Sequence, residues 1–198
     1  MFRTLLIFLF AYLAGSINFA IIFFKLTQRE DPRLSLSGNA GTTNVYRQAG
    51  MGWAAVIFLL DIGRALVVAI ISCYYLALSF VPWAAFFLIL GNSFPCFHGF
   101  RGGKGVANYL GYTLLIAPWA ALFSAVAWLI VFGFFRITFI ASFFMVFILA
   151  LGQANYGLWK IGALTGAAAS LLLIIFNHRI NIRNYRQPQE PSGPQQEE

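Results

Sequence analysis

The sequence predicts an all-α integral membrane protein with seven transmembrane helices. Of its 198 residues, 60% are hydrophobic and only 10% are charged, and the mean hydropathy is +0.77. A soluble domain would carry about 25% charged residues. A chain so poor in charge must expose most of its surface to lipid, so residues 1–186 are predicted to form one polytopic membrane domain.

The first predicted span covers residues 5–24. Arg3 followed by an apolar run could be taken for a signal peptide, but Tyr12 stands where a cleavage site needs a small residue. A run of about 20 apolar residues also matches the bilayer better than a cleaved segment of about 7–15 residues. We therefore interpret it as a transmembrane helix.

Six further apolar segments would complete the seven spans. The segment at 106–117 is shorter than the roughly 20 residues of a simple crossing. Pro118 follows it and would mark either a turn or a kink. The six segments are 53–80, 82–97, 106–117, 118–135, 139–154 and 156–176.

Positive charge is divided unevenly between the two sides that seven helices would create. One side receives ten lysines and arginines, and the other receives Arg3 and Lys160. Because cytoplasmic loops carry such an excess, we expect the N-terminus outside and the C-terminus in the cytoplasm. The tail, residues 187–198, is rich in Pro, Gln and Glu and is expected to be disordered. The ten residues are Lys25, Arg29, Arg33, Arg47, Arg101, Lys104, Arg136, Arg179, Arg183 and Arg186.

Two glycine-rich, basic segments would both face the cytoplasm. Residues 37–44 read Ser-Gly-Asn-Ala-Gly-Thr-Thr-Asn and are followed by Arg47, and residues 99–105 read Gly-Phe-Arg-Gly-Gly-Lys-Gly. Glycines let backbone N–H groups converge on an anion, and an adjacent Lys or Arg supplies full charge. Each segment alone has a simpler interpretation: a helix-capping polar turn for the first, a flexible loop with a snorkelling lysine for the second. Their shared side favours a phosphate site at the bilayer surface.

The residue inventory excludes several kinds of chemistry. Three of the six acidic residues lie in the tail, and no two carboxylates have a spacing suited to acid–base catalysis or a divalent metal. Two His and two Cys, widely separated, do not make a zinc site. Neither a Gly-x-Ser-x-Gly elbow nor the His-x4-Asp pattern of one acyltransferase class is present. We expect no metal, no cofactor and no nucleic-acid partner, and chemistry carried by cations, amides and hydroxyls.

Five polar residues in or beside the spans are further candidates. Asp61 and Arg64 share one face of the second span, and we favour a mutually neutralising pair that joins helices over direct substrate contact. His178 and Asn181 follow the last span, among arginines that would also attract anionic lipid. Ser142 lies in the sixth span, where a serine commonly bonds its own helix backbone.

Taken in order, these segments resemble the bacterial acyl-phosphate:glycerol-3-phosphate acyltransferase family (PlsY). The resemblance covers the chain from about residue 10 to residue 183. It is carried by Ser37-Gly38-Asn39-x-Gly41-x-Thr43-Asn44, by Phe94-Pro95 leading to Phe100-Arg101-Gly102-Gly103-Lys104-Gly105-Val106, by His178-Arg179-x-Asn181-Ile182, and by Gly15-Ser16-Ile17.

The resemblance implies a seven-helix enzyme of the bacterial cytoplasmic (inner) membrane, with its active site facing the cytoplasm. Such an enzyme transfers a fatty acyl group from acyl phosphate to the 1-hydroxyl of glycerol 3-phosphate, giving lysophosphatidic acid and phosphate for phospholipid biosynthesis. Membrane lipid and the enzyme that forms acyl phosphate are the implied partners. The implied catalytic residues are Lys104, Arg47, His178 and Ser37, and the implied substrate- and phosphate-binding residues are Gly38, Asn39, Thr43, Asn44, Gly102, Gly103, Ser142 and Asn181.

The sequence departs from the family pattern at several positions, which keeps an alternative open. Asn92 stands where the family usually has histidine, Arg64-Ala65 replaces its Lys-Gly, and Ile180 replaces its glutamate. The alternative is a diverged non-catalytic paralogue, or a transporter or binding protein for a phosphorylated or lipidic solute. Against transport, the sequence has few intramembrane charges and no repeat that suggests paired halves.

Overall fold

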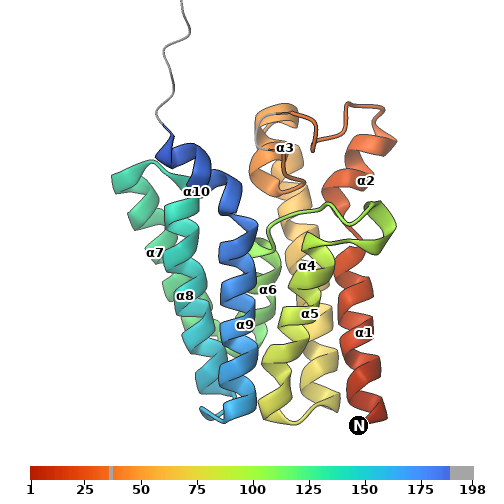
Figure 1. Cartoon of the computed structure of the whole chain (residues 1–198), viewed down its shortest axis with the longest axis vertical. Helices are drawn as coiled ribbons and strands as arrows, with labels where there is room; N and C mark the ends of the chain where they lie inside the picture. Colours follow the sequence, from red (N-terminus) through yellow and green to blue (C-terminus); the bar gives the residue numbers. More distant parts are fainter. Residues whose placement is uncertain (36–37, 188–198) are drawn as a thin grey trace, which may run out of the picture.

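The computed structural model describes residues 1–35 and 38–187, and all the regular secondary structure in this part of the chain is helical. The helices stand side by side as a bundle, with α2, α3 and α10 gathered at one end (Figure 1). The predicted all-α fold is therefore confirmed. The helices are α1 (Phe2–Ser16), α2 (Phe19–Leu26), α3 (Thr42–Ala49), α4 (Met51–Tyr75), α5 (Val81–Ser93), α6 (Val106–Ile116), α7 (Pro118–Phe135), α8 (Thr138–Tyr156), α9 (Ile161–Asn177) and α10 (Arg179–Arg186), with 3-10 turns at Leu78–Phe80 and Cys96–His98.

Five segments of the described chain are long and apolar enough to cross a membrane, or six if the bent pair α9–α10 counts as one span. The remaining apolar helix, α6, has 11 residues and is about 16 Å long, roughly half the thickness of the hydrocarbon core. Pro118 marks a turn and not a kink, because α6 ends at Ile116 and α7 begins at Pro118. The count of seven crossings stays a prediction.

The first predicted span is correct in extent but is not one continuous helix. It breaks between α1 and α2 at Ile17 and Asn18, which have extended backbone. The Asn18 side chain caps α2 by accepting a hydrogen bond from the Ile21 amide at 3.0 Å, and it donates to the Ala40 carbonyl at 3.3 Å. Because the asparagine side chain accepts from an amide that a helix start leaves free, α1 can end and α2 can begin at this point.

Helices α1 and α5 pack with their backbones in direct contact. A Cβ added to Gly15 would overlap the Leu88 carbonyl oxygen, and one added to Gly91 would overlap that of Tyr12. Small residues at such positions let membrane helices approach closely. Tyr12 also donates from its hydroxyl to the Phe94 carbonyl at 2.9 Å, which ties α1 to the end of α5.

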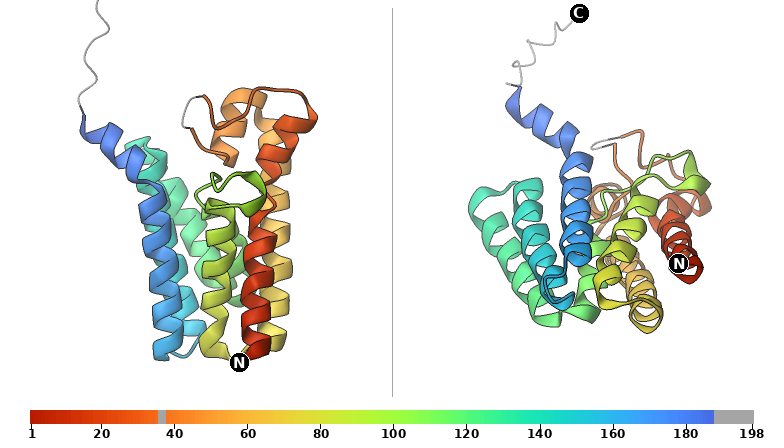
Figure 2. Two further views of the ribbon diagram at one scale, coloured as in Figure 1. Left: turned by 45° about the vertical axis from the view of Figure 1, so that its right-hand side comes forward. Right: turned by 60° about the horizontal axis from the view of Figure 1, so that its bottom comes forward.

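Both glycine-rich segments lie at the same end of the bundle. The loop between α2 and α3 and the loop between α5 and α6 meet there, and α10 leaves the bundle at that end in both views of Figure 2. The N-terminus and the turn between α8 and α9 lie at the opposite end (Figure 1). The fold therefore brings the predicted phosphate-handling segments together. Residues 188–198 of the predicted disordered tail lie outside the described part of the chain.

Candidate active site

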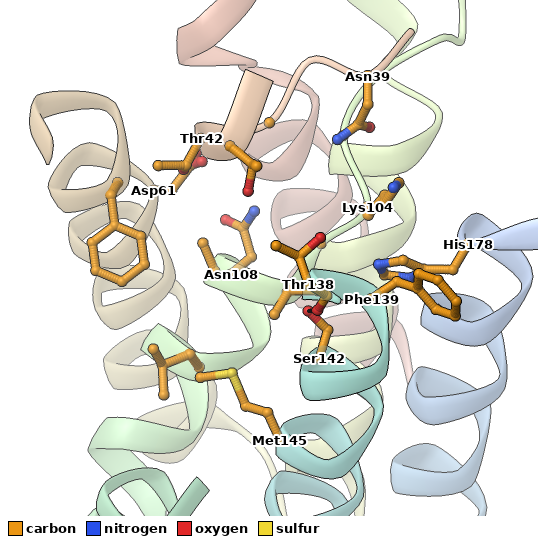
Figure 3. Close-up of a pocket in the computed structure, with 18 of the residues that line it drawn as sticks. Asn39, Thr42, Asp61, Lys104, Asn108, Thr138, Phe139, Ser142, Met145 and His178 are labelled. Atoms are coloured by element: carbon orange, nitrogen blue, oxygen red, sulfur yellow. Dashed lines mark hydrogen bonds between the residues drawn. The ribbon is translucent and has the colours of Figure 1, made fainter. Parts of the chain in front are cut away.

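A cavity of about 460 Å³ opens at the loop end of the bundle, between α3, α4, α6, α7, α8 and the start of α10. Its upper part is polar and basic, and its deeper part is apolar. Thr138, Ser142 and Met145 descend one face of α8 into it (Figure 3). The polar lining comprises Asn39, Thr42, Thr43, Arg47, Asp61, Asn92, Lys104, Asn108, Thr138, Ser142, His178 and Asn181, and the bulky apolar lining comprises Phe58, Leu110, Trp128, Leu129, Phe139 and Met145.

Lys104 and Arg47 supply the positive charge of the cavity. Lys104 projects from the loop before α6, and Arg47 lies in the last turn of α3. The Lys104 ammonium donates to the Asn181 Oδ1 at 2.5 Å, which links this loop to α10. Burial and the nearby Arg47 cation lower the pKa of Lys104 to about 8. Two close cations in a partly dry site favour an anionic ligand.

His178 lies at the junction of α9 and α10, where the chain bends by 47°. Its Nδ1 is 2.8 Å from the Ile174 carbonyl oxygen. Since a carbonyl can only accept, Nδ1 carries the proton of the neutral ring and Nε2 keeps a lone pair. His178 lines the cavity and packs edge-on against Phe143. The imidazole is therefore oriented as a potential proton acceptor.

Ser142 keeps its helix bond and also lines the cavity. Its hydroxyl donates to the Thr138 carbonyl at 2.9 Å and accepts from Trp128 Nε1 at 3.4 Å. The backbone bond predicted for a serine in this span is therefore confirmed.

The glycine-rich segment 37–44 divides between cavity lining and support. Asn39 and Thr43 line the cavity, whereas Gly38 and Asn44 are not among its lining residues. Asn44 is buried and donates from Nδ2 to the Pro32 carbonyl at 2.6 Å, so it holds the loop in place. Ser37 lies outside the described residues.

Gly102 and Gly103 differ from the expectation that their amides converge on an anion. The Gly102 amide donates to the Ser93 carbonyl at 3.1 Å, and the Gly103 amide donates to the Asn92 carbonyl at 2.9 Å. Both donors are thus occupied by the end of α5. A Cβ on Gly102 would overlap Asn92, so glycine is needed there for close approach of the backbones. These glycines position Lys104 and do not present free amides.

Asp61 and Arg64 form a buried ion pair, with Arg64 Nη2 at 2.7 Å from the Asp61 carboxylate. Arg64 also donates to Asn108 Oδ1 at 2.7 Å, to Asn92 Oδ1 at 3.3 Å and to the carbonyl of Ile17. These partners come from α5, α6 and the break after α1, while Arg64 belongs to α4. The predicted neutral pair that joins helices is therefore confirmed, and it forms part of the cavity wall through Asp61.

Several lining residues were not singled out from the sequence. Asn108 and Thr138 are polar residues within or at the start of apolar segments, a signal that could have identified them. Trp128 and Met145 lie in uniformly apolar helices and carry no such signal. In residues 1–35 and 38–187, no group of three or more His, Cys, Asp or Glu could hold a metal ion.

Comparison with known proteins identifies one family. The family model described as "Glycerol-3-phosphate acyltransferase" matches residues 5–187. A protein of that name from Pseudomonas fluorescens is 38% identical over 180 residues, covering 89% of this chain and 92% of its own. Another from Pseudomonas aeruginosa is 35% identical over 178 residues, covering 88% and 91%.

Two solved structures have the same fold. The crystal structure of PlsY (YgiH), an integral membrane glycerol 3-phosphate acyltransferase, in its glycerol 3-phosphate form aligns with a TM-score of 0.80. That chain is 35% identical and the alignment covers 92% of this chain and 91% of that one. The form with lysophosphatidic acid aligns with a TM-score of 0.77 at 34% identity, with the same coverage.

Proposed function

Because the chain belongs to the glycerol-3-phosphate acyltransferase family, we propose that it transfers a fatty acyl group from acyl phosphate to the 1-hydroxyl of glycerol 3-phosphate. The products are lysophosphatidic acid and phosphate. One observation carries the proposal: a single cavity has two cations near its mouth and an apolar interior. Both proposed substrates carry phosphate, and the donor also carries an aliphatic chain.

The polar part of the cavity suits the phosphate groups. Lys104 and Arg47 would bind phosphate oxygens, and Asn181, which already accepts from Lys104, would keep that ammonium in place. The one carboxylate among the lining residues, Asp61, is neutralised by Arg64 and so does not repel an anion.

The apolar part suits the acyl chain. Phe58, Leu110, Trp128 and Met145 come from four different helices and belong to the apolar lining of the cavity. Leu129, which also lines it, is 64% exposed on the outer face of α7. An acyl chain could therefore extend from the cavity into the surrounding lipid.

Acyl transfer needs little more than positioning and charge stabilisation here, because acyl phosphate is already an activated mixed anhydride. The acceptor oxygen bonds to the acyl carbon, the carbon–oxygen bond to phosphate breaks, and phosphate leaves with the electron pair. A substrate phosphate oxygen takes the hydroxyl proton, with the Nε2 lone pair of His178 as the alternative acceptor. Lys104 and Arg47 stabilise the charge that grows on the leaving phosphate.

The site belongs, in this proposal, to the cytoplasmic side of the bacterial inner membrane. Water-soluble glycerol 3-phosphate would enter from the loop end, and lysophosphatidic acid would leave into the bilayer. The enzyme that forms acyl phosphate is a proposed partner, since its product must reach the cavity.

The test incubates the purified protein with palmitoyl phosphate and glycerol 3-phosphate and measures phosphate release and lipid product. Release that requires both substrates supports the proposal. Movement of glycerol 3-phosphate into liposomes without product would favour the transporter alternative, and binding without either would favour a non-catalytic paralogue.

Lys104→Ala tests the site within the same assay. Loss of one charge-stabilising donor should lower kcat by about 100- to 1000-fold, or roughly 2.7–4 kcal/mol of transition-state stabilisation. The matched control is Lys25→Ala, which removes a lysine at the same end of the bundle but outside the cavity lining. Near-wild-type turnover of the Lys104 variant would remove this residue from the mechanism.

A further inference from the structure

The loop between α2 and α3, residues 27–41, and the loop between α5 and α6, residues 94–105, are joined through one arginine. We propose that Arg33 is a positioning residue that latches these two loops together and so fixes Lys104 opposite the α3 side of the cavity. Its role in turnover rests on the proposed function, whereas its effect on Lys104 does not.

Each of the three guanidinium nitrogens of Arg33 has a hydrogen-bond partner. Nε and Nη2 donate to the two oxygens of Asp31, at 2.9 and 2.6 Å. Nη1 donates to the carbonyls of His98 and Arg101, at 2.7 and 2.8 Å. A planar guanidinium can hold a carboxylate through two bonds and two carbonyls at once, which makes four bonds and exceeds the three donors of an ammonium.

Asp31 orients the arginine from within the same loop. Its carboxylate also accepts from the Arg33 backbone amide at 2.9 Å, so the ion pair closes a tight local turn. The hydrogen bonds from Arg33 lower the pKa of the Asp31 carboxyl, which stays charged throughout the neutral range. With two donors committed to Asp31, the remaining nitrogen points across to the second loop.

Few other contacts hold the two loops to each other. Among the described residues, the other hydrogen bond between them runs from the Ala40 amide to the Gly102 carbonyl and is longer, at 3.4 Å. The two carbonyls that accept from Arg33 lie on either side of a turn formed by Gly99 and Phe100. The φ angles of these two residues are +66° and +57°. This turn leads within a few residues to Lys104.

The latch therefore affects where Lys104 lies relative to the residues around it. From α3, Arg47 faces Lys104 and lowers its pKa; from the α9–α10 junction, His178 and Asn181 are beside it. If the latch is released, the second loop can move away from α3 and open to water. The Lys104 ammonium would then recover a pKa nearer its usual 10.5.

Two measurements test the latch. The first is kcat/KM for palmitoyl phosphate and glycerol 3-phosphate. The second is the pH midpoint at which Lys104 reacts with an amine-directed reagent, followed by mass spectrometry of its peptide, with Lys25 as internal reference. The second measurement needs no activity, so a wild type without turnover would refute the proposed function and still leave the latch tested.

Arg33→Ala should lower kcat/KM by at least about tenfold, because misplacement of a catalytic group by ~1 Å can cost about 100-fold. It should also raise the Lys104 midpoint from about 8 towards 10.5. The matched control is Arg29→Ala: Arg29 lies in the same loop and donates to the Gln48 carbonyl, and within the described part of the chain it makes no hydrogen bond to the second loop. Arg29→Ala should change neither quantity by more than about twofold in rate or a few tenths in midpoint.

Milder variants keep the test decisive if Arg33→Ala does not fold, which thermal unfolding would reveal. Arg33→Lys keeps the charge but not the fork, and Asp31→Asn keeps the shape but not the ion pair. Both should shift the midpoint in the same direction and by less. An unchanged Lys104 midpoint in a folded Arg33 variant would overturn the latch, as would equal effects in the Arg29 and Arg33 variants.

Discussion

Lys104 differs from the other cations at the loop end because it is both desolvated and close to a second cation. Burial and Arg47 lower its pKa to about 8. The ammonium is therefore charged below that pH and neutral above it, so the phosphate binding proposed for it is lost as the pH rises.

The plot of kcat/KM against pH should accordingly fall above a midpoint near 8, since this parameter reports groups of the free enzyme. In the plot of kcat the fall should come at higher pH, because bound phosphate stabilises the ammonium. In Lys104→Arg the fall should disappear, as guanidinium stays charged throughout. If that variant kept the same alkaline midpoint, another group would have to titrate.

Asn92 occupies the position where the resembled family has histidine, and its contacts indicate a structural role. Its Oδ1 accepts from Arg64 Nη2 at 3.3 Å, and its carbonyl accepts from the Gly103 amide at 2.9 Å. A histidine here would face the buried Arg64 cation, which disfavours a second positive charge.

We therefore expect Asn92→His to add no inflection near pH 6–7 to the pH–rate profile, and to be no faster than wild type. The comparison of the two profiles decides the matter. Faster turnover together with a new inflection in that range would show that a titrating group at this position assists the reaction, and that asparagine has impaired it.

At the scale of helices, the sequence predicted the ends of a helix best where composition alone determines them. The start of α7 at Pro118 and its end at Phe135 coincide with the predicted segment, because proline and an arginine bound an uninterrupted apolar run. The break at Asn18 was not predicted, because apolar residues continue on both sides of it and the capping bond forms only in three dimensions.

The candidate site likewise contains residues that the sequence predicted and residues that it did not. The resemblance identified Lys104, His178, Asn181 and Ser142, and all four line one cavity. Trp128 could not, because its place depends on how α7 packs on α8. The free amides expected of Gly102 and Gly103 also depend on packing, since the carbonyls that occupy them belong to α5.

The α1–α5 contact can be tested through its glycines. Gly91→Ala would place a methyl group on the Tyr12 carbonyl oxygen, so the two helices must separate. We expect a loss of about 1–3 kcal/mol in the free energy of unfolding, the usual cost of overpacking, measured by thermal or chemical unfolding in detergent.

Gly63→Ala is the matched control for this variant. Gly63 also lies within a long apolar helix, but a Cβ there would meet no atom within 4 Å. Alanine should therefore be neutral or stabilising by up to about 1 kcal/mol at this position. Equal destabilisation by both substitutions would show that the α1–α5 contact does not set the cost.

At the scale of the whole molecule, the two ends of the bundle differ sharply in charge. The loops and the helices α2, α3 and α10 at one end hold ten basic residues, among them Lys25, Arg101 and Arg183, whereas Arg3 and Lys160 lie at the other end. The cavity opens at the basic end. Orientation in the membrane thus decides which compartment supplies the water-soluble substrate.

Positive charge is retained on the cytoplasmic side of bacterial membranes, so the loop end should face the cytoplasm. Reporters fused after Lys25, after Arg101 and at Glu198 should all report a cytoplasmic location, and one fused after Lys160 should report the outside. The Lys160 fusion is the control, because it shows that the assay can detect the external side. A reporter after Ala117 examines α6, which must carry the chain outward if there are seven crossings, although it has only 11 residues. An external signal from either basic loop would place the cavity on the wrong side for a cytoplasmic supply of glycerol 3-phosphate, and would overturn the proposed orientation.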